Sequence, residues 1–255
     1  MTREPHSRAL FDWKALALIA LLVLVAVLVW YSSRPVVLPL LPELRPFAEK
    51  YGPSRNSQFG EEWLIRDFFQ DKRGGIFVDV GANHHQSLST TYYLEVALGW
   101  SGIAVEPLAQ FAEGYAKHRP RTKFRPFFVS DASDQQAKLY VLKHNTLISS
   151  GDKSFTEQWG GTAEAMTAPT ITLNDLLAAE KIDRFDFLSM DIETWEPKAL
   201  AGFDIQRFRP ALVCIESHEE VLQQILDYFA HNQYVLVGKY LKADEHNLYF
   251  TPLRD

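Results

Sequence analysis

The period of the apolar residues changes repeatedly after about residue 58, and the changes predict alternating helices and strands. Residues 61–69 have apolar side chains at helical spacing and are soon followed by a glycine pair. The next apolar run, residues 76–80, is short enough for a buried strand. The same patterns predict further strands at residues 102–107, 123–131, 137–142, 185–193 and 211–218, with helices at residues 93–98, 108–118, 172–180, 196–201 and 219–232. Two strands in succession, residues 234–240 and 246–252, end the pattern.

Strands that alternate with helices at this spacing predict an α/β fold with a doubly wound, mostly parallel sheet. The two strands at the end depart from the alternation, and we expect the last of them to run antiparallel. In Rossmann-like sheets of this kind, ligands bind beyond the carboxyl ends of the strands, where the strand order reverses. Polar residues at strand ends are therefore the candidates for function.

The chain before residue 58 has a different composition and predicts three further segments. Residues 15–31 contain no charge and have tryptophans at their edges, as expected of a short transmembrane helix. We interpret them as an uncleaved anchor rather than a signal peptide, because no small-residue cleavage site follows. A short tail, residues 1–14, precedes the anchor, and a stalk with five prolines, residues 32–57, follows it. The predicted soluble domain is residues 58–255.

The overall charge excludes one class of function. The formal net charge is −6, whereas a nucleic-acid-binding domain normally carries a basic excess on one face. A local basic run, Arg119, Arg121, Lys123 and Arg125, is interpreted as a solvated connection between a helix and a strand. The single cysteine, Cys214, rules out a disulfide framework within one chain and a zinc site built from several cysteines.

The first two strand ends suggest a nucleotide-like ligand. The run FVDVGANHH places Asp79 inside an apolar strand and follows it with Gly81 and Asn83 in a tight turn. Gly81 lets the backbone approach a ligand closely. Glu106 ends the next strand, where an acid can accept hydrogen bonds from both ribose hydroxyls of a nucleoside. The G-x-G-x-x-G fingerprint of dinucleotide-binding domains is missing, which argues against a nicotinamide-dependent oxidoreductase.

Two later strand ends add further polar groups. Ser130 and Asp131 end the third strand, where they could meet an adenine amino group. Asp191 and Glu193 stand at alternate positions of another strand end, so that their side chains point to the same side. Placing two carboxylates together is electrostatically costly, which suggests proton transfer, metal binding or the holding of a cationic centre.

The order of these motifs resembles the FkbM-type methyltransferases. The segments FVDVGAN, GIAVEP, ITLNDLL, FDFLSMDIETWEPKAL and ALVCIE carry the resemblance, together with the flanking SQFGEEWLIRDFF and TTYYLEVALGWSG. The resemblance covers residues 58–216 and implies a class I fold that binds S-adenosylmethionine and methylates hydroxyl groups of sugars or other small molecules. It also implies that Asp79, Gly81 and Asn83 line the methionine part of the cofactor, and that Glu106 holds its ribose.

The resemblance has one departure, in the segment that follows the fifth predicted strand. FkbM-type chains usually read D-x-E-G-x-E there, whereas this chain has Asp191, Glu193 and Glu196 with Thr194 in place of the glycine. The candidates for the base that removes the acceptor proton are Asp191, Glu193 and His218. Of these we favour Asp191 or His218, because both are expected at adjacent strand ends facing the cofactor.

A metal site is an alternative use of the same acids. Asp191, Glu193 and Glu216 could hold a divalent cation through oxygen ligands, but we assign no metal ligand. The neighbouring His84 and His85 are expected to point in different directions in an extended loop. We interpret both histidines as loop residues beside the cofactor.

We therefore expect a membrane-anchored, S-adenosylmethionine-dependent O-methyltransferase that acts on a sugar, a glycolipid or another small molecule. The polar segment 144–169 is expected to cover the acceptor, and its Trp159 could stack on a sugar ring. No nucleic-acid partner is expected. Because S-adenosylmethionine is made in the cytosol, we expect a single-pass anchor with the domain in the cytoplasm. The alternatives are a catalytically inactive, membrane-tethered interaction protein on the same fold and a nicotinamide-dependent oxidoreductase.

Overall fold

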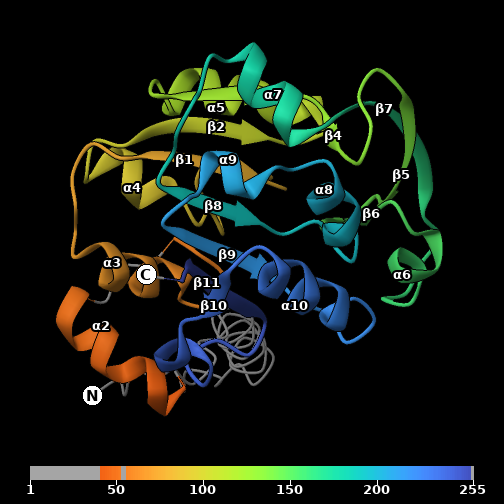
Figure 1. The fold of residues 1–255 in the computed structure, drawn as a ribbon. Coiled ribbons are helices and arrows are strands. Elements are labelled where there is room, and N and C mark those ends of the chain that lie inside the picture. Colours follow the sequence, from red (N-terminus) through yellow and green to blue (C-terminus); the bar gives the residue numbers. More distant parts are fainter. Residues whose placement is uncertain (1–40, 53–55, 254–255) are drawn as a thin grey trace, which may run out of the picture. The chain divides into compact units, whose positions relative to one another are not determined.

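A mixed seven-stranded sheet with helices on both faces forms the centre of the fold (Figure 1). The computed structural model describes residues 41–52 and 56–253. The strand order is β10–β11–β9–β8–β1–β2–β3, and all pairs are parallel except the two that contain β11. The alternating pattern thus correctly predicted a mostly parallel sheet with an antiparallel strand near the chain end. The strands are β1 (Ile76–Val80), β2 (Ser101–Val105), β3 (Thr122–Arg125), β8 (Phe187–Met190), β9 (Leu212–Glu216), β10 (Tyr234–Leu236) and β11 (Asn247–Pro252).

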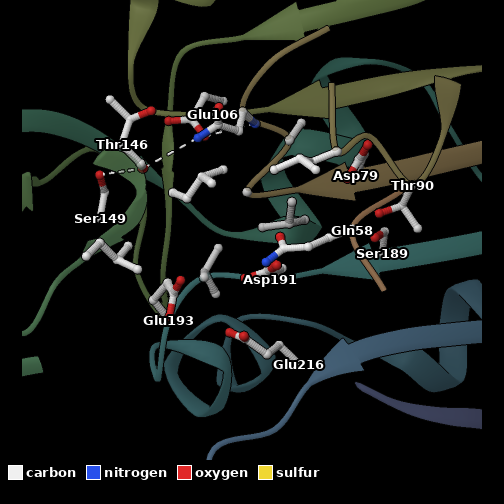
Figure 2. Close-up of a pocket in the computed structure, with 18 of the residues that line it drawn as sticks. Gln58, Asp79, Thr90, Glu106, Thr146, Ser149, Ser189, Asp191, Glu193 and Glu216 are labelled. Atoms are coloured by element: carbon white, nitrogen blue, oxygen red, sulfur yellow. Dashed lines mark hydrogen bonds between the residues drawn. The ribbon is translucent and has the colours of Figure 1, made fainter. Parts of the chain in front are cut away.

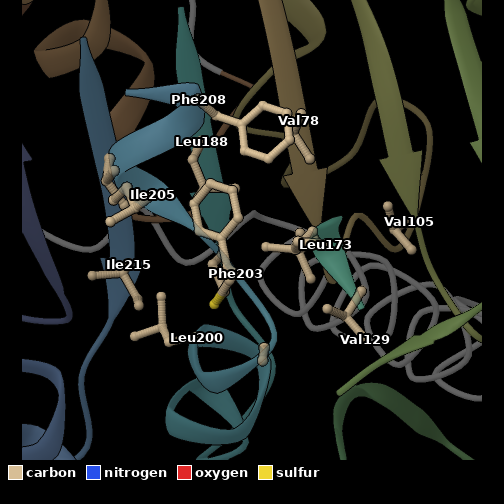
Figure 3. Close-up of a cluster of buried hydrophobic side chains, with 14 of the residues drawn as sticks. Val78, Val105, Val129, Leu173, Leu188, Leu200, Phe203, Ile205, Phe208 and Ile215 are labelled. Carbon is tan, nitrogen blue, oxygen red and sulfur yellow. The ribbon is translucent and has the colours of Figure 1, made fainter. Parts of the chain in front are cut away.

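Helices cover both faces of this sheet because alternate strand residues point to opposite sides. Val78 of β1 and Leu188 of β8 belong to the larger apolar core, under α7 (Leu173–Ala179), α8 (Glu196–Ala201), α9 (Ile205–Phe208) and α10 (Leu222–His231) (Figure 3). On the other face, Phe69 packs edge-on against Trp100 and Phe187, with ring centroids 5.0 and 6.3 Å apart. The helices on that face are α3 (Glu61–Phe69), α4 (Tyr92–Val96) and α5 (Ala112–His118).

A second, four-stranded sheet stands beside the main one, in the order β4–β7–β5–β6. The predicted strand 123–131 is therefore two strands in different sheets. Pro126, which has no N–H to donate to a ladder, lies between them. The polar segment 144–169 is also more regular than expected, because two of these strands and a short helix run through it. The elements are β4 (Phe128–Val129), β5 (Gln136–Leu142), β6 (Asn145–Ser150), α6 (Lys153–Glu157) and β7 (Glu164–Ile171).

The described part of the predicted stalk contains a helix that is bound to the domain. After a 3₁₀ turn, Pro42–Leu44, the chain forms α2 (Arg45–Tyr51). Nε1 of Trp63 in α3 donates to the carbonyl of Gly52 at 3.0 Å, and Lys50 pairs with Asp67 of α3 at 3.3 Å. Residues 41–52 thus belong to the folded unit that continues to the chain end.

The predicted membrane anchor, residues 15–31, and the tail before it lie outside the described residues. Within residues 41–52 and 56–253, no helix has the length and apolar character needed to cross a bilayer. Two further 3₁₀ turns, Ala109–Phe111 and Gly238–Tyr240, complete the regular structure of the described part.

Candidate active site

A cavity of about 390 Å³ opens at the carboxyl ends of β1, β2, β8 and β9 (Figure 2). The sheet order explains its position, because the chain proceeds from β1 to β2 and β3 on one side and places β8 and β9 on the other. The order therefore reverses between β1 and β8, where α/β sheets of this type bind ligands. Of the nine predicted site residues, seven line this cavity: Asp79, Gly81, Asn83, Glu106, Asp191, Glu193 and His218.

The turn after β1 has the positive φ angles that glycine and asparagine tolerate. Gly81 has a φ of +80°, and a Cβ atom placed there would lie 1.8 Å from the carbonyl oxygen of Asp191. Only glycine fits this approach between the two strand ends. Asn83 adopts a φ of +42°, in the left-handed region that asparagine tolerates better than most residues. The turn thus brings bare backbone to the cavity.

Glu106 lies at the end of β2 with its carboxylate held by two backbone amides. Asn83 donates to Oε2 at 3.1 Å, and Leu108 donates to Oε1 at 2.9 Å. The residue is only 5% exposed. Burial raises the pKa of Glu106 to about 7, against the opposing effect of the two N–H donors. Each carboxylate oxygen keeps a second lone pair for a ligand hydroxyl.

Asp79 is buried in β1 beneath the same turn. Its Oδ2 accepts a hydrogen bond from the Thr91 hydroxyl at 2.7 Å. Burial raises the pKa of Asp79 to about 6, although the Thr91 hydrogen bond and the Arg119 charge oppose the shift. Arg119 is itself fully buried and pairs with Glu95 at 2.5 Å. Hydrogen bonds and an ion pair among buried polar residues therefore support the protein on this side of the cavity.

The ends of β8 and β9 bring three acids and a histidine together. Nε2 of His218 lies 3.2 Å from Oε2 of Glu193 and 3.0 Å from Oε2 of Glu216. Asp191 lines the cavity and is exposed to it. The sequence predicted that the side chains of Asp191 and Glu193 point to the same side. In the structure both residues line the same cavity, which agrees with this prediction (Figure 2).

Proton affinities in this cluster are strongly shifted. Burial, with the nearby carboxyl groups of Glu216 and Glu193, raises the pKa of Asp191 well above its usual range. Burial also raises the pKa of Glu196 to about 8. Hydrogen bonds to Glu193 and Glu216 raise the pKa of His218 to about 10. Without another cation present, His218 is therefore an imidazolium at neutral pH.

The second sheet supplies a wall of the cavity. Residues 145–149 of β6 line it, and the Asn83 side-chain amide donates to the carbonyl of Thr146 at 3.4 Å. Ser150 donates to the carbonyl of Glu193 at 2.7 Å, which ties β6 to the acidic cluster. Trp159 also lines the cavity and is 59% exposed. The segment expected to cover the acceptor thus contributes to the cavity, mainly as a strand.

Several lining residues were not identified from the sequence. Phe59 and His246 stack at 3.7 Å between ring centroids, although they are far apart in the chain. Backbone amides hold both residues, since Phe59 donates to Glu61 at 2.7 Å and His246 donates to Asp244 at 3.0 Å. No local pattern signals such a pair, because the contact arises only when β11 inserts beside β9.

The structure does not bring Ser130 and Asp131 to the cavity, in contrast to the prediction. The chain leaves the main sheet after β3, and β4 pairs with β7 instead. Ser130 is buried there and donates to Asp131 at 3.0 Å. The predicted adenine contact of these two residues stays a prediction.

The other polar features noted in the sequence lie away from the cavity. His85 stacks on His118 with ring centroids 4.8 Å apart. Lys123 and Arg125 pair with Glu180 at 2.9 and 2.5 Å. Arg119, Lys123 and Arg125 of the basic run are thus engaged in ion pairs. Cys214 is buried.

An α/β sheet with a glycine turn and acidic residues at adjacent strand ends is typical of class I methyltransferases. The family model for the methyltransferase FkbM domain matches residues 79–236, more than half of the chain. The chain belongs to the FkbM methyltransferase family. It is an S-adenosylmethionine-dependent methyltransferase, and the resemblance seen in the sequence is confirmed.

Several solved structures are similar to this chain at low identity. A TehB-like methyltransferase from Corynebacterium glutamicum is 14% identical, with 82% of this chain and 93% of that chain covered and a TM-score of 0.43. An O-methyltransferase from Bacillus cereus in complex with SAH is 13% identical, with 86% and 94% covered and a TM-score of 0.42. A methyltransferase from Geobacter sulfurreducens in complex with S-adenosylhomocysteine is 11% identical, with 80% and 78% covered and a TM-score of 0.39. No curated protein matches the sequence.

Proposed function

We propose that this protein transfers a methyl group from S-adenosylmethionine to a hydroxyl group of a sugar, a glycolipid or another small molecule. The observation that carries the proposal is the single cavity that joins the Gly81 turn and Glu106 to the acid Asp191. Methyl transfer to oxygen needs a methyl donor and a proton acceptor on the two sides of one small space.

The residues of the cavity fit the cofactor. The backbone of the Gly81 turn borders the cavity and is proposed to hold the methionine part, with Asp79 and Asn83 beside it. Glu106, whose two oxygens are held by backbone amides at the cavity, is proposed to accept the ribose hydroxyls. When bound, S-adenosylmethionine supplies an electrophilic methyl group on a positively charged sulfur. The carboxylates of the cavity favour that positive charge.

Asp191 is the proposed proton acceptor for the hydroxyl. It lies directly beside the Gly81 turn, and therefore closer to the cofactor side than Glu193 and His218, which contact each other. As the oxygen–carbon bond forms and the sulfur–carbon bond breaks, the hydroxyl proton passes to the Asp191 carboxylate. Glu193 and His218 orient the acceptor in this assignment.

The direct test is methyl transfer from radiolabelled S-adenosylmethionine by the detergent-solubilised full chain. A panel of glycans, glycolipids and small alcohols identifies the acceptor. We expect Asp191→Asn to lower kcat at least about 100-fold, whereas Asp183→Asn, an exposed residue before the same strand, leaves kcat unchanged. Methylation of amines but not of alcohols would contradict the proposal. Binding of S-adenosylhomocysteine with no transfer to any acceptor would favour the inactive interaction protein.

We also propose that residues 15–31 anchor the protein in a membrane, with the domain on the cytoplasmic side. The length and composition of this segment support the proposal. The full chain should sediment with membranes and resist carbonate extraction, whereas a chain starting at residue 41 should not. Protease digestion of the domain in intact cells would contradict the cytoplasmic orientation.

A further inference from the structure

The carboxyl ends of β8 and β9 place three metal-ligating side chains within reach of one another. One donor atom each of Glu193, Glu216 and His218 lies within 4.8 Å of the other two. In the part of the chain that the structure describes, these three residues are the one such group of histidine, cysteine and acidic side chains. All three line the cavity, so that an ion there would be reachable from the acceptor side.

The distances within this group resemble those between the ligands of a bound ion. Two donor atoms held at about 2.1 Å from one ion, at tetrahedral or octahedral angles, are about 3.0–3.4 Å apart. Nε2 of His218 is 3.0 Å from Oε2 of Glu216 and 3.2 Å from Oε2 of Glu193. An ion can therefore replace the imidazole proton without a large movement of these side chains.

Negative charge around the group exceeds what one imidazolium balances. Oε2 of Glu216 is buried and faces the single imidazole of His218, at 3.0 Å from Nε2, which Glu193 also contacts. Glu196 is fully buried nearby, and its Oε2 has no hydrogen-bond partner among the described residues. Asp191 adds a further carboxyl group, which is subject to electrostatic repulsion from Glu216 and Glu193. Buried carboxyl groups without partners are costly unless a cation or protons balance them.

We propose that Glu193, Glu216 and His218 bind a divalent first-row transition-metal ion at the acceptor end of the cavity. Two carboxylate oxygens and one imidazole nitrogen suit ions such as Mn²⁺ or Zn²⁺ better than Mg²⁺, which prefers oxygen ligands alone. Binding releases one proton from Nε2 of His218 to solvent. Because all three side chains line the cavity, an acceptor hydroxyl could reach an ion held there. The ion thus orients the acceptor hydroxyl and lowers its pKa, a role that rests on the proposed methyl transfer.

The test is calorimetric titration of the tag-free, detergent-solubilised full chain with MnCl₂ after removal of metals by a chelator. We expect one Mn²⁺ per chain, with affinity weakened at least about tenfold in Glu216→Gln and in His218→Asn. Glu219→Gln, an exposed neighbour, is the matched control and should bind like the wild type. MgCl₂ should bind more weakly than MnCl₂. Equal affinity in all variants, or no wild-type binding at millimolar Mn²⁺, would overturn the proposal.

Thermal unfolding separates loss of the site from loss of the fold. Glu216→Gln removes one of the two carboxylates at His218 and leaves Glu193 in contact with the imidazole, so that the metal-free variant should still unfold in one cooperative transition. Added Mn²⁺ should raise the melting temperature of the wild type but not that of the variant. S-adenosylhomocysteine binding is measured on the same metal-free protein. If it persists while Mn²⁺ does not bind, the metal site is refuted and the methyltransferase proposal stands.

Discussion

Glu106 links cofactor binding to pH at the scale of one residue. Burial favours its neutral form and raises its pKa to about 7. The free protein therefore keeps this proton up to about neutral pH, whereas an acid that accepts two ribose hydroxyls does so best when ionised. Cofactor binding thus releases the proton. We expect the affinity for S-adenosylhomocysteine to rise as the pH is raised from 6 to 8, as measured by calorimetry.

The control for this prediction is Glu106→Gln, which has nearly the same shape but does not titrate. It should bind S-adenosylhomocysteine at least about tenfold more weakly at pH 8, because one charged acceptor of two hydrogen bonds is lost. Its affinity should change much less between pH 6 and 8, with Asp79 as the remaining titrating acid of the cofactor side. A variant as sensitive to pH as the wild type would show that Glu106 does not carry the effect.

Thr194 shows what the departure from the family pattern does to the backbone. It has a φ of +74°, and the preceding Glu193 has a φ of +57°. The backbone thus takes the left-handed conformation that a glycine would adopt without strain, and a β-branched residue there is strained. Thr194→Gly should increase the free energy of unfolding by about 0.5–1 kcal/mol, after the entropy cost of glycine is subtracted.

Urea denaturation of Thr194→Gly and Thr194→Ala measures this effect. Alanine keeps a Cβ atom and should give a smaller gain than glycine, since part of the strain persists. If neither variant gains stability, the left-handed backbone at this position is not strained. The residue also shows a limit of the sequence, which reveals that the glycine is missing but not that the backbone at this position is left-handed.

At the scale of elements, a buried ion pair joins α4 to the end of α5. Arg119 contacts Glu95 of α4 at 2.5 Å and donates to the carbonyl of His85 at 2.9 Å. Glu95 is 4% exposed and also accepts from the backbone of Arg121 at 2.7 Å. Arg119→Leu leaves the Glu95 charge buried and unpaired. We expect a loss of about 3–5 kcal/mol in the free energy of unfolding.

Two control variants make this prediction specific. Arg119→Leu combined with Glu95→Leu should recover most of the lost stability, because both charges are removed. Arg121→Ala, which removes an exposed guanidinium, should change the free energy of unfolding by less than about 0.5 kcal/mol. Chemical denaturation of all variants provides the measurement. A double variant as unstable as Arg119→Leu would mean that the loss comes from packing rather than from an unpaired charge.

The elements differ in how well the sequence predicted them. The strand at residues 76–80 and the helix at residues 61–69 have clear periods and ended close to the predicted positions. The second sheet was missed because its ladder joins β4, β5 and β7 across long separations in the chain. Its β6 is rich in polar residues, and only pairing with β5 makes it a strand.

At the scale of the molecule, the cavity draws on four strands of one sheet and three strands of another. A ligand that fills it binds only the folded chain. S-adenosylhomocysteine at 100 times its Kd should therefore stabilise the protein by about 2.7 kcal/mol. The melting temperature should rise by about 5–10 °C, as measured by differential scanning calorimetry. NADH is the control ligand, and an equal shift with NADH would contradict the assigned cofactor.

The sequence by itself determined the class of fold and the family, and it identified seven residues that line the cavity. These features depend on short-range signals, namely the period of apolar residues and the acids and glycine that end predicted strands. Only the tertiary structure decided which strand ends meet. It excluded Ser130 and Asp131 from the cavity, added the Phe59–His246 stack, and placed His218 between two glutamates. Such contacts depend on strand order, which the spacing of residues along one chain does not encode locally.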